Sequence, residues 1–132
     1  MDDVVLVDTD VFSYLWQNRP EGAPFRPLVE GRVVALSFTS VAEAYYGAYR
    51  RRWTDQKFRG LENAISPYLI LPYDIEMSRR WGQVSADLET AGLPRADNDV
   101  WIAVIALHYS IPLVTNNRSH FERSLDSGSS RD

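Results

Sequence analysis

Carboxylates stand where short apolar runs of this sequence are followed by helical patterns. Asp8 follows the apolar run at 4–7. Glu43 lies in the helix expected after a second run at 32–38, and Asp99 stands near the start of a later, apolar helix. Clustered carboxylates repel one another and persist only where protons or a cation neutralise them. Because oxygen ligands suit Mg²⁺ and Mn²⁺, which can activate a water and stabilise charge on a phosphate oxygen, this pattern suggests phosphate-ester chemistry.

Each of these residues also has a purely structural interpretation, since Ser, Thr, Asp and Asn are the preferred helix caps and turn residues. Glu43 sits three residues after Ser40, as in a capping box. At least one residue of 97–99 is expected to act only as a cap. The residues with such an interpretation are Asp8, Thr9, Asp10, Glu43, Asp97, Asn98, Asp99 and Asn117. The set as a whole, rather than any single member, therefore indicates a metal site.

The elements that would position these residues alternate between short apolar strands and helices. Strands are expected at 4–7, 32–38, 67–73 and 111–115, and the main helices at 9–16, 39–53, 54–65, 74–92 and 98–109. This alternation predicts a parallel sheet covered by helices on both faces. Ligands of such sheets bind outside the carboxyl ends of the strands. Asp8, Glu43 and Asn117 are expected at that edge, and Asp99 joins them because a helix that returns to the sheet begins there.

Composition excludes several classes of protein. The chain has 132 residues, a hydrophobic fraction of 45% and a net charge of −4, as expected for one globular domain. It contains no cysteine, which excludes disulfides and thiolate metal sites and suits a reducing cytoplasm. No apolar stretch approaches the length of a membrane span. The overall acidity argues against a protein that coats nucleic acid.

A local basic and aromatic segment remains compatible with a phosphodiester substrate. In YYGAYRRRW at 45–53, Tyr45 and Tyr49 share a helix face, and three arginines follow at 50–52. Arginine and aromatic side chains suit RNA backbone contact and base stacking. The structural alternative is that the tyrosines pack against a core or dimer surface and the arginines form a solvated helix end. Candidate contacts to RNA or to a protein partner are Tyr45, Tyr49, Arg50, Arg51 and Arg52.

Four segments in order, LVDTDVFSYL, SVAEAYYGA, NDVWIAVIAL and LVTNNRSHF, resemble the PIN domain, and specifically the VapC-like ribonuclease toxins of bacterial toxin–antitoxin pairs. The resemblance spans residues 4–123. It implies a three-layer α/β/α sandwich with a short central parallel sheet, here expected over 1–123, followed by a polar tail at 124–132. It also implies a cytoplasmic, Mg²⁺- or Mn²⁺-dependent endoribonuclease that hydrolyses RNA phosphodiester bonds with a metal-activated water. The implied partners are a VapB-like antitoxin and a second copy of the chain.

The resemblance assigns the acidic positions of the family one at a time. Its first acid falls on Asp8, with Thr9 in support; its second falls on Glu43, and its third on Asp99. The polar site of the fourth motif falls on Asn117. Asp8 and Asp99 are thus expected to hold one ion, Glu43 to position or deprotonate the attacking water, and Asn117 to orient ligands or a phosphate oxygen. Asp97 and Thr115 are candidate supporting residues.

One departure from the family pattern keeps an alternative open. His120 stands where the family often carries an acid, so a second metal ion would be poorly held. A catalytically weak or inactive PIN-like binding module is therefore the main alternative. A phosphatase of the haloacid dehalogenase type is the next, because VVLVDTDVF superficially matches its strand followed by D-x-D. That chemistry requires a downstream lysine, and Lys57 lies on an unsuitable amphipathic helix.

Overall fold

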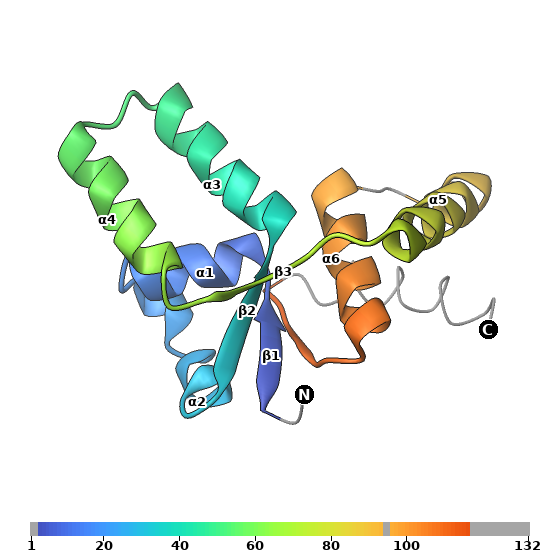
Figure 1. Ribbon diagram of the computed structural model, residues 1–132, viewed down its shortest axis with the longest axis horizontal. Helices are drawn as coiled ribbons and strands as arrows, with labels where there is room; N and C mark the ends of the chain where they lie inside the picture. Colours follow the sequence, from blue (N-terminus) through green and yellow to red (C-terminus); the bar gives the residue numbers. More distant parts are fainter. Residues whose placement is uncertain (1–2, 94–95, 117–132) are drawn as a thin grey trace.

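β-Branched and leucine-rich runs form the centre of the fold, a parallel sheet between two layers of helices (Figure 1). The computed structural model describes residues 3–93 and 96–116. Within these ranges the sheet has four strands in the order β3-β2-β1-β4. Their bounds are β1 Val4–Val7, β2 Val33–Ser37, β3 Leu69–Leu71 and β4 Leu113–Val114, and each neighbouring pair is parallel. The predicted α/β/α sandwich with a short parallel sheet is therefore confirmed.

Alternation along β1 divides the core between the two faces of the sheet. Val5 and Val7 pack on one face against the helices α1 (Thr9–Trp16), α3 (Phe38–Arg50) and α4 (Asp55–Ile65). Leu6 packs on the other face against α5 (Ile75–Thr90) and α6 (Asp97–Tyr109). Because successive strand residues point to opposite faces, one strand contributes to both clusters. A short 3₁₀ turn (Pro20–Gly22) and α2 (Arg26–Val29) connect α1 to β2.

The helix α6 is apolar on nearly all sides because it is buried. Val100 and the five residues at 102–106 are at most 5% exposed, and they pack between the sheet and α5. This confirms the buried helix that the sequence predicts. A helix fixed in this way gives the residues at its first turn a defined position at the sheet edge.

Helix boundaries follow local signals, with two corrections. The strand expected at 32–38 ends at Ser37, whose side chain accepts from the Thr39 amide and caps α3, so Ser40 is not the cap. The N-cap of α6 is Ala96, without a side-chain cap, so none of Asp97, Asn98 and Asp99 has the expected role of N-cap. Both corrections leave the side chains after the cap available for tertiary contacts.

The helices that follow β1 and those that precede β4 lie on opposite faces of the sheet. The chain goes from β1 through α1 to β2 on one face, and from β3 through α5 and α6 to β4 on the other. Open α/β sheets bind ligands at such a reversal. Asn117, His120 and the tail at 124–132 lie outside the described residues. In the ranges that are described, no helix has the length and apolar character needed to cross a membrane.

Candidate active site

Asp8 is anchored by three hydrogen bonds at the carboxyl end of β1. Its Oδ1 accepts from the Val11 amide at 2.8 Å, which makes Asp8 the N-cap of α1. Its Oδ2 accepts from the Thr115 hydroxyl at 2.7 Å and from the Asn116 amide at 3.1 Å. The capping interpretation is therefore correct for Asp8. It does not exclude a second role, because a carboxylate has about four acceptor sites and three are used.

Burial dominates the electrostatics of Asp8, which is only 4% exposed. Burial raises the pKa of its carboxyl, while the hydrogen bonds from Thr115, Val11 and Asn116 act in the opposite direction. The nearby carboxyl of Asp10 raises the pKa further. A buried carboxylate of this kind gains from a cation that neutralises it. Thr115, expected as a supporting residue, is thus placed directly on the first acid.

Glu43 reaches away from its own helix start. Because Ser37 caps α3, Glu43 is not the capping-box partner of Ser40. Its Oε1 instead accepts from the Thr9 hydroxyl at 2.7 Å and from Nδ2 of Asn98 at 2.5 Å. The side chains of α1, α3 and α6 therefore meet at one carboxylate oxygen. This arrangement could not be read from the spacing within any single helix.

Thr9 shares its hydroxyl between several neighbours. Its Oγ1 lies 2.9 Å from Oγ of the buried Ser40 as well as 2.7 Å from Glu43, and it accepts from Asn98 at 3.1 Å. A hydroxyl has one proton to donate, so the two acceptors compete for it. The sequence predicts that Thr9 supports Asp8, whereas the hydroxyl of Thr9 contacts Glu43 and Ser40.

Asn98 is the site residue that sequence reasoning missed, because it was interpreted only as one of several helix caps. Its Nδ2 serves Glu43 and Thr9, whereas its Oδ1 is buried and has no hydrogen-bond partner among the described residues. Leaving a buried acceptor unpaired costs about 1–3 kcal/mol. The position next to Asp99, at the start of a buried helix beside the sheet edge, was the signal in the sequence.

One hollow of about 200 Å³ collects the acidic residues. It is lined by Asp8, Thr9, Asp10, Glu43, Ala96, Asn98, Asp99 and Ile102. The predicted convergence of Asp8, Glu43 and Asp99 at the carboxyl edge of the sheet is therefore present. Asp10, expected only as a capping neighbour, follows the actual cap in the first turn of α1 and lines the same hollow. Asp97 lines a different, apolar hollow with Phe38 and Trp101.

The carboxylates that line this hollow offer oxygen ligands, which are the type that a hard divalent ion such as Mg²⁺ prefers. Over residues 3–93 and 96–116, no three acidic or histidine side chains converge tightly enough to form a metal site by themselves. Mg²⁺ commonly keeps several waters and takes one or two carboxylates. The arrangement fits that mode of binding, and it does not form a closed cage of protein ligands.

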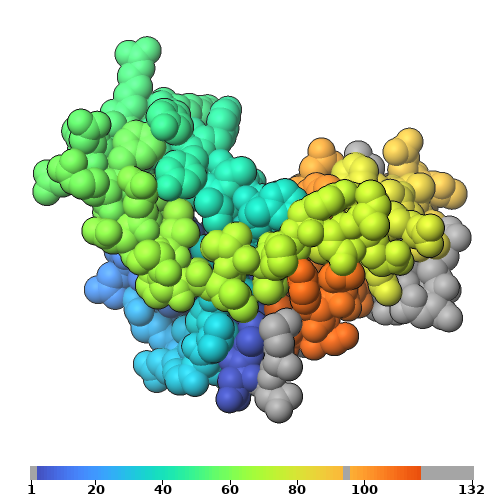
Figure 2. Space-filling view, viewed as in Figure 1, coloured from blue at the N-terminus to red at the C-terminus, as the bar shows by residue number. Residues whose placement is uncertain are grey.

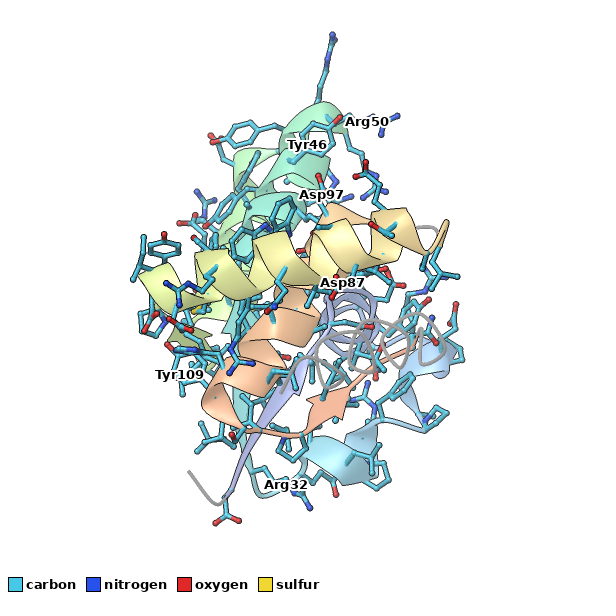
Figure 3. All side chains as sticks on the ribbon, turned by 90° about the vertical axis from the view of Figure 1, so that its right-hand side faces the viewer. Arg32, Tyr46, Arg50, Asp87, Asp97 and Tyr109 are labelled. Carbon is cyan, nitrogen blue, oxygen red and sulfur yellow. The ribbon has the colours of Figure 1, made fainter. Side chains whose placement is uncertain are left out.

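A second hollow of about 500 Å³ adjoins the acidic one and is basic on its outer side. Thr9, Asp10 and Glu43 line both hollows, and Tyr46, Gly47, Arg50 and Arg51 complete the second. Figure 3 shows Tyr46 and Arg50 on the end of the molecule that carries Asp97, with Arg32 at the opposite end. Positive charge thus lies beside the carboxylates, where a phosphate chain would need it.

Tyr45 and Tyr49, the tyrosines expected to contact RNA or a protein partner, are not among the residues that line this basic hollow. Tyr45 is partly buried in the core cluster beneath α4, and desolvation raises the pKa of its hydroxyl. Tyr49 packs against Phe58 of α4, with ring centroids 4.7 Å apart. Arg52 follows α3 in the turn to α4, with φ of 54°. Tyr46, one residue after Tyr45, is the aromatic residue that lines the basic hollow.

Comparison with known proteins adds an independent finding. The family model described as PIN domain matches residues 5–124. Ribonuclease VapC2 of Haemophilus influenzae strain Rd is 30% identical over 118 residues, which cover 89% of each chain. The tRNA(fMet)-specific endonuclease VapC of Shigella flexneri is 27% identical over 118 residues, again 89% of each chain. Both alignments therefore cover most of this chain and most of the relative.

Solved structures share the same arrangement of elements. VapBC-1 from nontypeable Haemophilus influenzae matches with a TM-score of 0.78 and 28% identity, over 93% of each chain. VapBC2 from Rickettsia felis, solved with a DNA fragment from its promoter, matches with a TM-score of 0.78 and 24% identity, over 91% of this chain and 92% of that one. At the latter identity the match concerns the fold alone.

Proposed function

We propose that this chain, which belongs to the PIN domain family, is a metal-dependent endoribonuclease that acts as the toxin of a toxin–antitoxin pair. The observation that carries the proposal is a pair of adjoining hollows: Asp8, Glu43 and Asp99 line one, and Arg50 and Arg51 line the other. Acidic side chains at the centre and arginines at the rim suit a phosphodiester. The names of the VapC relatives, ribonuclease and endonuclease, support RNA as the substrate.

In this proposal Asp8 and Asp99 hold one Mg²⁺ or Mn²⁺ ion, directly or through water. The ion would supply positive charge next to the scissile phosphate and lower the pKa of a water. Hydrogen bonds from Val11, Thr115 and Asn116 hold the Asp8 carboxylate in one orientation, which would suit this role. Asn117, outside the described residues, remains a proposed ligand-orienting residue.

Glu43 would position the attacking water and accept its proton. Its Oε1 is occupied by Thr9 and Asn98, so Oε2 is the atom that would face the water. The water oxygen would attack phosphorus, and the bond from phosphorus to the 3′ oxygen would break, with the leaving oxygen taking up a proton from solvent. The products are a 3′-hydroxyl and a 5′-phosphate. Arg50 and Arg51 would hold the phosphate chain on the adjoining side.

Protein partners are part of the proposal. The solved relative named VapBC-1, at 28% identity, supports a VapB-like antitoxin as one partner. A second copy of this chain is the other. Apolar side chains at the site's edge support protein contact: Phe38, Ala42 and the partly buried Trp101 line an open hollow with Tyr46, which is 66% exposed. Figure 2 shows the surface hollowed between the arm of α3 and α4 and the layer of α5 and α6. Because cellular RNA would be the substrate, we propose that the protein acts in the cytoplasm.

Cleavage of total cellular RNA by the purified protein tests the proposal. Mg²⁺ or Mn²⁺ would be added, with EDTA and the Asp99→Asn variant in parallel, and Asp55→Asn as a matched control on the exposed start of α4. Discrete products from the wild type and the control, lost with EDTA and in Asp99→Asn, support the proposal. Absence of products together with absence of Mn²⁺ binding by calorimetry would favour the non-catalytic binding module instead.

A further inference from the structure

We infer that Asn98 is a positioning residue that fixes the carboxylate of Glu43 for the reaction. The inference rests on the proposed ribonuclease function and names a residue outside the acidic set. Nδ2 of Asn98, in the first turn of α6, lies 2.5 Å from Oε1 of Glu43 on α3. The two residues are 55 positions apart in the chain.

The orientation of the Asn98 amide follows from its neighbours. The same Nδ2 lies 3.1 Å from the Thr9 oxygen, so both of its hydrogens have acceptors. The reverse orientation would place the amide oxygen against the Glu43 carboxylate, where two acceptors repel. Glu43 therefore determines which way the amide points, and the amide in turn restrains Glu43.

Thr9 alone would not restrain Glu43 to the same extent. Its single hydroxyl proton is contested by Ser40, whose oxygen is 2.9 Å away, and by Glu43. Asn98 donates two hydrogens and does not share this competition. Glutamate has three rotatable side-chain bonds, and Glu43 lies on an exposed stretch of α3. Removing the Asn98 donor would therefore release the carboxylate into other rotamers.

The other end of the Asn98 side chain argues against a purely structural role. Its Oδ1 is buried without a partner among the described residues, which destabilises the fold. The residue is also not the helix cap, because Ala96 occupies that position. An apolar side chain here would avoid the unpaired oxygen. The contribution of Asn98 therefore lies in its donor end, which faces Glu43.

Kinetics of two variants test the inference. Asn98→Ala removes the donor, and Asn98→Asp keeps the shape but presents a carboxylate to Glu43. We expect kcat on an RNA that the wild type cleaves to fall about 10- to 100-fold, as for a misplaced catalytic group. KM should stay within about threefold, because Asn98 does not bind substrate. Asn63→Ala, on α4, is the matched control and should behave as wild type.

A double-mutant cycle and NMR distinguish positioning from a structural role. In a Glu43→Gln background, measured by single turnover, Asn98→Ala should lower the rate by much less than in the wild type. In ¹⁵N spectra, Glu43→Gln should shift the side-chain amide signal of Asn98, and Glu62→Gln on α4 should leave it in place. The NMR comparison needs neither metal nor activity.

Unchanged kcat in Asn98→Ala, with a cleaving wild type, would overturn this inference and leave the proposed function intact. A raised KM at unchanged kcat would also overturn it, since Asn98 would then contact substrate. If the side-chain amide signal of Asn98 did not shift in Glu43→Gln, the contact on which the inference rests would be absent in solution, and the inference would be overturned. Failure of the wild type to cleave any RNA, with bound Mn²⁺ absent, would overturn the proposed function and the catalytic part of this inference together.

Discussion

The hydroxyl of Thr115 donates to Oδ2 of Asp8 across 2.7 Å, although the two residues are 107 positions apart. The contact joins the ends of β1 and β4, which pair directly in the sheet. These strands have their connecting helices on opposite faces, so the contact lies where the topology reverses. A polar pair at this reversal fixes the first acid of the site before any ligand is present.

Removing the Thr115 hydroxyl should weaken metal binding. Thr115→Val keeps the β-branched shape and deletes the donor to Asp8. We expect Mn²⁺ affinity to fall about 10- to 100-fold, as for outer partners of metal-binding carboxylates. The free energy of unfolding should fall by roughly 1–2 kcal/mol. Calorimetric titration with Mn²⁺ and urea denaturation measure the two quantities. Thr90→Val at the exposed end of α5 is the control, and equal affinity in both variants would contradict the prediction.

Neutralising the third acid should abolish cleavage and preserve the fold. Asp99→Asn removes one carboxylate from the hollow without changing its size. We expect the cleavage rate to fall by at least about 10²-fold, because charge stabilisation in such sites is worth that much. The far-ultraviolet circular dichroism spectrum and melting temperature should remain close to those of the wild type. Retained cleavage in a metal-dependent assay would mean that Asp99 has no part in the reaction.

Acidification should weaken metal binding earlier than for an ordinary aspartate. Burial raises the pKa of Asp8, so a proton competes with the ion at higher pH than it would for an exposed carboxyl. We expect Mn²⁺ affinity, measured by calorimetry at several pH values, to decline as the pH falls through this raised pKa. A midpoint at or below the ordinary value of 3.8 would contradict the prediction.

Without metal, the same pKa predicts the sign of a stability change. The folded pKa of Asp8 lies above the unfolded one, so the fold prefers the protonated carboxyl. The stability it contributes is fully present below the unfolded pKa and is lost as the pH rises through the folded pKa. In urea denaturation with EDTA, the wild type should lose stability relative to Asp8→Asn over that rise. The opposite trend would show that its hydrogen bonds outweigh burial.

The arginines beside the acids should affect substrate binding rather than the chemical step. Replacing Arg50 and Arg51 with Gln should raise KM and leave kcat nearly unchanged. Each lost phosphate contact should reduce the salt dependence of RNA binding by about 0.7 in the logarithmic slope. Binding to an RNA by the inactive Asp99→Asn protein at several salt concentrations measures this slope. Arg32→Gln, at the opposite end of the molecule, is the control and should leave the slope unchanged (Figure 3).

Local signals in the sequence determined the elements and the edge at which the site forms. Apolar runs predicted β1 through β4, and Thr54 and Asp74 marked the starts of α4 and α5. These predictions succeed because strand burial and helix capping depend on neighbours a few residues away. The position of Asp8 at the exit of a buried strand followed from the same local pattern, and so did the placement of Asp99 at the start of a buried helix.

Only the tertiary structure decided which side chains meet. The strand order brings Thr115 to Asp8, and the packing of α6 beside α3 brings Asn98 to Glu43. Ser37 displaced Ser40 as the cap of α3 because β2 ends one residue earlier than the apolar run suggests. That shift left Glu43 available for a distant donor. Such contacts depend on strand order and helix packing, which spacing along one element does not encode.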